Sequence, residues 1–179
     1  MKGIIFTEFL ELVEDKFGLE MVDTIISENE LESDGAYTAV GTYDHSEMVQ
    51  LVVSLSKHSD IPVDSLLIVY GEYLFGTFVK SYGHFIEAAP DSFTFLKSVE
   101  SYIHVEVKKL YHDAELPSFD TKEEGKNVME MIYKSERKLS AVAEGLVIGC
   151  LKHYGEEGTV VRELIKEDGS EVKFTITKA

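Results

Sequence analysis

The chain has 179 residues, the length of one domain, and its 44% hydrophobic content is enough to build a core that encloses a large ligand. Its 33 acidic residues outnumber 17 basic ones, and the net charge of -16 would repel nucleic-acid phosphates and anionic bilayers. We therefore expect no nucleic-acid partner and no membrane association. The single cysteine, Cys150, permits neither an internal disulfide nor a cysteine zinc cluster, and it fits a reducing compartment.

No targeting or membrane-spanning segment is expected. The first ten residues contain Glu8 and no apolar run as long as that of a signal peptide. The most apolar stretch, residues 66–79, is interrupted by Glu72 and is shorter than the roughly 20 residues that a membrane span needs. These features predict a cytoplasmic protein.

Three helices are predicted in the first 60 residues. Apolar side chains between Ile4 and Phe17 recur every three or four positions, which predicts an amphipathic helix ending near Gly18. A second helix is expected over residues 21–31. A turn-rich stretch then leads to Asp44 or Ser46, either of which could cap the third helix.

A long helix is predicted from Val63 to Tyr82, with Pro62 in its first turn. Its apolar residues cover much of its circumference, so it should pack on two sides. Gly71 in this helix, and Gly145 and Gly149 in a later one, lower helix stability relative to alanine. Each glycine therefore indicates a close approach, either of another helix or of a flat ring.

The segment from Ser92 to Tyr111 predicts another amphipathic helix. Its apolar stripe is Phe93, Leu96, Val99, Ile103, Val107 and Leu110. His104 lies just beyond the edge of this stripe and would face the core from the side, either as an ordinary half-buried histidine or as a ligand. Glu100 could share a helix face with His104, but the pair supplies only two of the three or more ligands that a protein metal site needs. We therefore expect Glu100 to be solvated.

After Pro117 the hydrophobic pattern changes from helical to alternating. Strands are predicted at Phe119, 128–133, 159–165 and 172–177, the last two joined by a hairpin turn over residues 167–170. A helix over residues 139–154 separates the second strand from the third. The predicted fold class is α+β, with about six helices followed by a small antiparallel sheet that has one inserted helix.

The stretch from Asn127 to Arg137 (NVMEMIYKSER) is interpreted as a strand that runs toward this inserted helix. In an extended chain Tyr133, Ser135 and Arg137 point the same way, so two hydroxyls and a guanidinium converge on one face. These donors suit a planar carboxylate, which Arg137 can bind bidentately. A solvated edge strand that ends in polar residues would show the same spacing.

Five segments in combination resemble the heme nitric-oxide/oxygen-binding (H-NOX) family, the gas-sensing domains related to the heme domain of soluble guanylate cyclase. The segments are MKGIIF at the start, IHVEVKKLY around His104, ELPSF around Pro117, YKSER, and AEGLVIG. Each one alone is weak, but the combination is specific and the resemblance covers the whole chain. It implies one heme-binding sensor domain over residues 1–179, with heme between a helical subdomain (1–60) and a heme-ligating α+β subdomain (61–179).

The resemblance also implies how the heme is held. His104 would be the proximal iron ligand, Tyr133, Ser135 and Arg137 would hold the two propionates, and Pro117 would press the heme out of planarity. The absence of a Cys-x-x-Cys-His motif excludes covalent attachment, so the cofactor would be a non-covalent heme b.

The other side of the heme would be lined by six residues, all apolar: Ile5, Phe9, Leu74, Phe78, Val142 and Leu146. In relatives that bind oxygen stably, a tyrosine stands at the position that matches Val142 and donates a hydrogen bond to the gas. Bound O2 carries partial negative charge and gains from such a donor, whereas NO on ferrous iron needs little help. We therefore expect NO and CO to bind and O2 to be excluded.

These features predict a non-enzymatic NO sensor in which NO releases His104 and the change is passed to a separate protein. Relatives commonly act on a histidine kinase or a cyclic-di-GMP enzyme. A peroxidase-like heme enzyme is an alternative, but it would need a polar acid-base residue on the distal side. A cofactor-free interaction domain is the other alternative.

Overall fold

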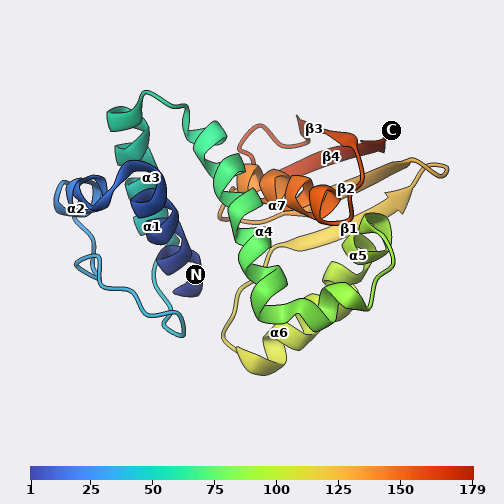
Figure 1. Ribbon diagram of the computed structural model, residues 1–179, viewed down its shortest axis with the longest axis horizontal. Coiled ribbons are helices and arrows are strands. Elements are labelled where there is room, and N and C mark those ends of the chain that lie inside the picture. Colours follow the sequence, from blue (N-terminus) through green and yellow to red (C-terminus); the bar gives the residue numbers. More distant parts are fainter. The chain divides into compact units, whose positions relative to one another are not determined.

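The computed structural model describes residues 1–179. Helices occupy the chain up to Leu110, and a four-stranded antiparallel sheet with one inserted helix follows, so the predicted α+β class is confirmed (Figure 1). The chain forms two compact units, residues 1–70 and 71–179, and the boundary falls within α4. None of the helices combines the length and the apolar character needed to cross a membrane.

The first unit contains three complete helices: α1 (Ile4–Phe17), α2 (Leu19–Ser27) and α3 (His45–Ser59). The first helix ends as predicted, because Gly18 adopts a positive φ of 87° that favours glycine. Asp44 is the cap of α3, where its carboxylate accepts a hydrogen bond from the Ser46 N–H at 2.7 Å. Local signals in the sequence therefore determine where these helices begin and end.

A buried carboxylate, Glu47, holds the loop between α2 and α3. Its side chain accepts hydrogen bonds from the hydroxyls of Ser33 at 2.5 Å and Tyr37 at 2.6 Å, and the residue is only 3% exposed. The Tyr37 ring also stacks on Phe6 of α1, with ring centroids 4.4 Å apart. The loop is thus fixed to both α3 and α1.

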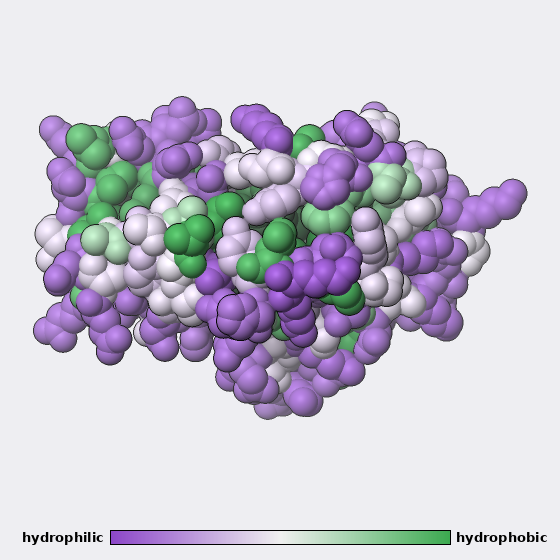
Figure 2. Space-filling model, turned by 90° about the horizontal axis from the view of Figure 1, so that it is seen from below, coloured by the Kyte–Doolittle hydropathy of each residue, from purple (hydrophilic) through white to green (hydrophobic).

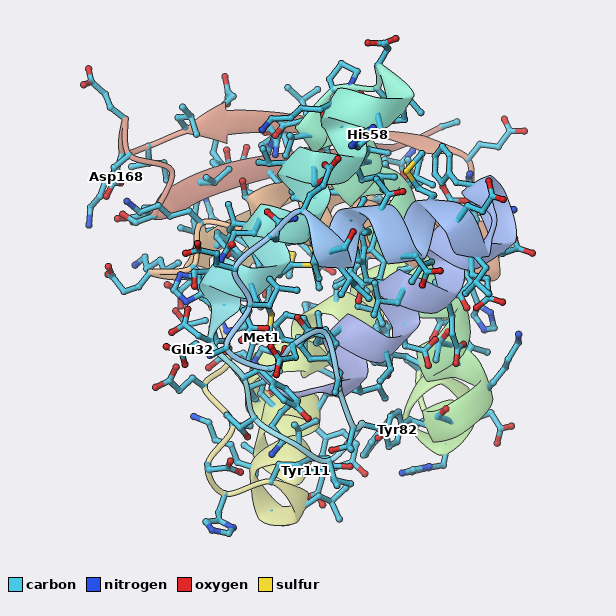
Figure 3. All side chains as sticks on the ribbon, turned by 90° about the vertical axis from the view of Figure 1, so that its left-hand side faces the viewer. Met1, Glu32, His58, Tyr82, Tyr111 and Asp168 are labelled. Atoms are coloured by element: carbon cyan, nitrogen blue, oxygen red, sulfur yellow. The ribbon has the colours of Figure 1, made fainter.

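The long helix α4 (Val63–Glu87) runs past the predicted end at Tyr82, which has non-helical backbone angles and marks a kink. Tyr111, just after α6, hydrogen-bonds the Tyr82 phenol, and burial together with this bond raises the pKa of Tyr82. Figure 3 shows both tyrosines at the same end of the molecule. The kink is therefore tied to the end of the segment that carries His104.

The predicted helix from Ser92 to Tyr111 is a helix in three parts: α5 (Ser92–Ser98), the π-helix η1 (Val99–Ile103) and α6 (His104–Leu110). The wider π turn adds one residue, which rotates everything after it by about 100° relative to a regular helix. Leu110, expected in the apolar stripe, is consequently 64% exposed. The prediction of a regular helix was wrong at this point.

The sheet has the strand order β1-β2-β4-β3 and is antiparallel throughout. Its elements are β1 (Ser118–Glu123), β2 (Val128–Lys134), β3 (Gly158–Leu164) and β4 (Glu171–Lys178), with α7 (Ser140–His153) between β2 and β3. Alternate residues of the two central strands are fully or almost fully buried in one core with side chains of α5 and α7. Figure 1 shows α7 lying along this sheet.

Glycines allow α4 and α7 to cross with their backbones in contact. A Cβ atom on Gly71 would lie 2.2 Å from the carbonyl oxygen of Val142, and one on Gly149 would lie 2.7 Å from the Cβ of Phe75. Gly145 also meets this crossing, with its Cα 2.9 Å from the same Cβ position on Gly71. The close approach indicated by these glycines is therefore that of a neighbouring helix.

Adding a methyl group at this crossing should destabilise the protein. Gly149→Ala forces α7 away from Phe75, and we expect it to lower the free energy of unfolding by about 1–3 kcal/mol despite the better helix propensity of alanine. Gly76→Ala is the matched control, since Gly76 lies in α4 with open space around its Cβ position and should gain about 0.5–1 kcal/mol. Denaturant unfolding measures both. Equal stabilisation by the two substitutions would contradict the tight crossing.

Candidate functional site

His104 is the first residue of α6 and directly follows the π turn, where its backbone N–H donates to the carbonyl of Val99. Its side chain is 14% exposed, and Nδ1 lies 3.1 Å from Oε2 of Glu100. A carboxylate oxygen accepts hydrogen bonds, so Nδ1 carries the proton and Nε2 keeps its lone pair for another partner. The Glu100 side chain is 46% exposed, as expected for a solvated carboxylate, and it is also hydrogen-bonded to His104, which was not predicted.

Glu100 also reaches the sheet. Its Oε2 accepts a second hydrogen bond, at 3.1 Å, from the backbone N–H of Phe119 in β1, which is an edge strand. The Phe119 ring lies beside His104, with ring centroids 5.8 Å apart, and its other neighbour is Tyr133 at 5.7 Å. One carboxylate therefore connects the imidazole to the strand that packs next to it.

The environment keeps His104 neutral. Burial lowers the pKa of its imidazole, and the hydrogen bond and charge of Glu100 only partly oppose this effect. The neutral form is the one that binds metals, because protonation would occupy the Nε2 lone pair. The lone pair of a neutral imidazole is on Nε2 when Nδ1 donates to Glu100, and Nε2 is the atom that could bind a metal.

The structure brings Tyr133, Ser135 and Arg137 together, although not along one strand as predicted. The strand β2 ends at Lys134, and residues 135–138 form a turn that closes with Lys138 at a φ of 57°. The Ser135 hydroxyl accepts a hydrogen bond from the Arg137 N–H at 3.2 Å and also bonds the Tyr133 phenol. The strand assignment for Ser135, Glu136 and Arg137 was therefore wrong, and the structure joins the two hydroxyls to the backbone of Arg137.

Tyr133 is almost completely buried, at 2% exposure, and its oxygen accepts a hydrogen bond from the Leu139 N–H at 3.1 Å. Burial raises the pKa of the phenol, so it stays neutral and keeps a proton to donate. Together with Ser135 it provides two hydroxyls beside the backbone of Arg137.

The guanidinium of Arg137 already holds a carboxylate in this structure. One of its nitrogens, Nη2, lies 2.8 Å from Oε2 of Glu115, and Nη1 donates to the backbone carbonyl of the same residue. The Arg137 side chain is 16% exposed, whereas that of Glu115 is 87% exposed. The Arg137 guanidinium is thus oriented to bind a carboxylate, which is the chemistry that a heme propionate requires.

Pro117 lies between these two sets of contacts. It is partly buried, directly precedes β1, and stands two residues after Glu115 and two before Phe119. The same short segment therefore contacts both Arg137 and His104.

Two of the six apolar residues predicted for the distal side, Ile5 and Phe9, lie one turn apart on α1 in the first unit. Phe9 is 1% exposed, and its ring meets the edge of the Tyr70 ring at a centroid distance of 5.3 Å. The Tyr70 hydroxyl donates to the carbonyl of Ile5 at 2.5 Å. The Tyr70 hydroxyl, which the sequence analysis did not consider, thus already donates a hydrogen bond within the first unit.

The other four belong to the second unit. Leu74 and Phe78 lie one turn apart on α4, and Val142 and Leu146 lie one turn apart on α7. The carbonyl of Val142 and the backbone nitrogen of Leu146 both meet Gly71 at the crossing of the two helices. No side chain in this set carries a hydrogen-bond donor.

The sequence contained one usable signal for the residues that were missed. Glu100 and His104 are four residues apart, so they lie on one face of a helix. Because the pair alone has too few ligands for a metal site, this spacing predicts a hydrogen bond between the two side chains. Glu115 lies 22 residues from its partner Arg137, and Phe119 lies 19 residues from Glu100. Nothing local in the sequence indicates those two contacts.

Comparisons with known proteins point to one family. The haem-NO-binding (HNOB) family model matches residues 2–162. The H-NOX protein from K. algicida, solved as an unliganded Fe(II) crystal structure, is 50% identical, with a TM-score of 0.96 and coverage of 100% of this chain and 97% of that one. The Shewanella woodyi H-NOX in the Fe(II)CO state with IWP-051 bound is 42% identical, with a TM-score of 0.84 and coverage of 100% and 95%.

An H-NOX protein from S. oneidensis in the Fe(II)NO state is 23% identical, and its TM-score of 0.92, with coverage of 100% of this chain and 99% of that one, supports the shared fold alone. A search of curated proteins gives no match. A family model that spans most of the chain and a half-identical relative with the same fold lead to one conclusion. The chain belongs to the haem-NO-binding (H-NOX) family of heme gas-sensor domains, which bind heme and are sensors rather than enzymes.

Proposed function

We propose that this domain is a cytoplasmic sensor of nitric oxide in which His104 ligates a ferrous heme b, O2 is excluded, and NO binding releases His104 as the signal. The observation that carries the proposal is a neutral, half-buried imidazole with Nε2 free, in the same unit as a guanidinium that holds an exchangeable carboxylate. When bound, the heme would supply an iron that can bind both an imidazole and a diatomic gas.

The chain's own residues divide the work of binding. His104 supplies the iron ligand, and Tyr133, Ser135 and Arg137 hold the propionates through two hydroxyls and a guanidinium. Pro117 contacts the heme from the segment between these two sets of residues. In this proposal residues 61–179 form the heme-ligating subdomain and residues 1–60 the helical subdomain.

Gas selectivity is assigned to the six apolar residues Ile5, Phe9, Leu74, Phe78, Val142 and Leu146. Bound O2 is stabilised by a hydrogen-bond donor that none of these side chains provides, whereas NO and CO bind without one. The Tyr70 hydroxyl beside Phe9 supports this assignment, because it already donates to the Ile5 carbonyl.

Signalling follows from the loss of one bond. With heme bound, His104 would hold the iron, and its release on NO binding would free the segment from Ser92 to Leu110 from this tether. This segment exposes Tyr102, Val105 and Leu110 to solvent, so its movement changes an apolar surface that another protein can contact.

The partner is proposed to be a histidine kinase or a cyclic-di-GMP enzyme. Hydrophilic residues dominate the face of the molecule in Figure 2, and its apolar side chains form separate patches. A net charge of -16 favours a partner with a basic surface.

Replacing His104 by glycine tests the iron ligand. Purified His104→Gly should lose most of its heme, and free imidazole should restore it, because the small ligand fits the space left by the side chain. Heme content and the visible spectrum measure both effects. Wild-type heme content and spectrum in His104→Gly without imidazole would remove His104 from the proposal.

The same variant tests the release. In imidazole-loaded His104→Gly the iron is already disconnected from the helix, so hydrogen exchange over residues 92–110 should be as fast as in the NO complex of the wild type. Slow exchange like that of the NO-free wild type would show that release of His104 does not loosen this segment.

Arg137→Ala tests the propionate contacts. Loss of a bidentate charged hydrogen bond should weaken heme binding by about 10- to 100-fold. Lys134→Ala, which removes an exposed cation three residues earlier, is the control and should leave heme affinity unchanged. Heme transfer to apomyoglobin measures both rates of loss. Equal rates in Arg137→Ala and wild type would place the propionates elsewhere.

Val142→Tyr tests the gas selectivity. The reduced wild type should bind NO and CO and form no stable O2 complex in air, while Val142→Tyr gains the missing donor and should form one. Val142→Phe is the matched control, because it adds the same ring without the hydroxyl and should not bind O2. Absorption spectra of the reduced proteins in air show whether each one forms an O2 complex. A stable O2 complex of the wild type would contradict the proposal.

A further inference from the structure

We propose that Glu100 is a positioning residue that fixes the orientation of His104 and strengthens the bond His104 forms with the heme iron. The proposal rests on the proposed function, because it requires His104 to be the iron ligand. It adds a residue that the family resemblance did not include among the heme contacts.

The geometry restricts the imidazole through one oxygen atom. Oε2 of Glu100 accepts from His104 Nδ1 and from the Phe119 backbone N–H, each at 3.1 Å. One donor belongs to the helix and the other to the edge strand β1, so the carboxylate is held from two elements. Rotation of the imidazole would break the first bond and separate its ring from that of Phe119, now 5.8 Å away.

The π turn sets the register of the pair. It spans Val99–Ile103, so it includes Glu100 and ends directly before His104. Without the additional residue, His104 would point about 100° away from its present direction relative to α5. Single π turns inside α-helices occur frequently at functional sites, and this one places the two partners on the side that faces β1.

The hydrogen bond has a chemical consequence at the other ring nitrogen. An anionic acceptor at Nδ1–H draws the proton toward itself and raises the electron density on Nε2, which makes the imidazole a stronger donor to a metal. A stronger donor also stabilises the more oxidised iron. Since NO must break this bond to release His104, Glu100 sets how much bond strength the gas has to overcome.

The first test uses the holoprotein and measures the iron–histidine bond directly. Glu100→Gln keeps an oxygen acceptor for Nδ1–H but removes its charge. Resonance Raman spectroscopy should give a lower iron–histidine stretching frequency than in the wild type, and the midpoint potential of the heme should be more positive. Glu106→Gln is the matched control, because Glu106 is on the same helix and bonds Lys109 instead. An unchanged frequency and potential in Glu100→Gln would overturn the proposal.

The second test separates this proposal from the proposed function. In His104→Gly, free imidazole can donate its N–H to Glu100, whereas 1-methylimidazole has no N–H to donate. The baseline is the ratio of the affinities of imidazole and 1-methylimidazole for the double variant His104→Gly with Glu100→Ala. In His104→Gly alone, this ratio should be about tenfold larger. Heme loading at graded ligand concentrations measures this ratio.

The outcomes differ for the two proposals. If neither ligand restores heme to His104→Gly, the proposed function fails at the iron ligand. If both restore heme and their affinity ratio equals that of the double variant, His104 remains the ligand and Glu100 has no positioning role.

Discussion

The carboxylate of Glu100 joins the His104 segment to the edge of the sheet, and the arrangement of the site depends on this connection. A second polar network fixes the start of the segment, where Ser92 bonds Glu156 and Lys178 lies 2.9 Å from the same carboxylate. Lys178 also stands 4.1 Å above the ring of Phe93. The helix that carries the proposed iron ligand is thus connected to the sheet region at its start, through Ser92, and near its middle, through Glu100. Loss of a bond at its middle can therefore be transmitted to the strands.

Most elements could be predicted because their signals are local. Gly18 ends α1 through its positive φ, and the Asp44 carboxylate caps α3. The hairpin between β3 and β4 lies where turn residues interrupt an alternating pattern, with Asp168 at its tip (Figure 3). Its carboxylate accepts from the N–H and hydroxyl of Ser170, which stabilises the turn. In each case the deciding interaction spans only a few residues.

The features that were not predicted depend on contacts between distant residues or on backbone states without a sequence signature. A π turn differs from an α turn by one residue, and the apolar spacing across Val99–Ile103 is compatible with both. The turn after Lys134 needs a positive φ at Lys138, where a glycine would have been the recognisable signal. The hydroxyls of Tyr133 and Ser135 therefore meet as expected, although the backbone conformation from which this was inferred was wrong.

The charge of this acidic chain supports the proposal that Arg137 binds an anionic cofactor. Only two of the seventeen cationic residues are arginines, and Arg162 is committed to Glu144 in a pair whose side chains are 21% and 15% exposed. Glu115, the partner of Arg137, is 87% exposed, and an ion pair with so exposed a carboxylate contributes about 0–1 kcal/mol at most. Exchanging Glu115 for a propionate therefore costs little. In the proposed function, Arg137 is therefore the guanidinium that can exchange its partner for a propionate, because the exposed Glu115 carboxylate returns readily to water.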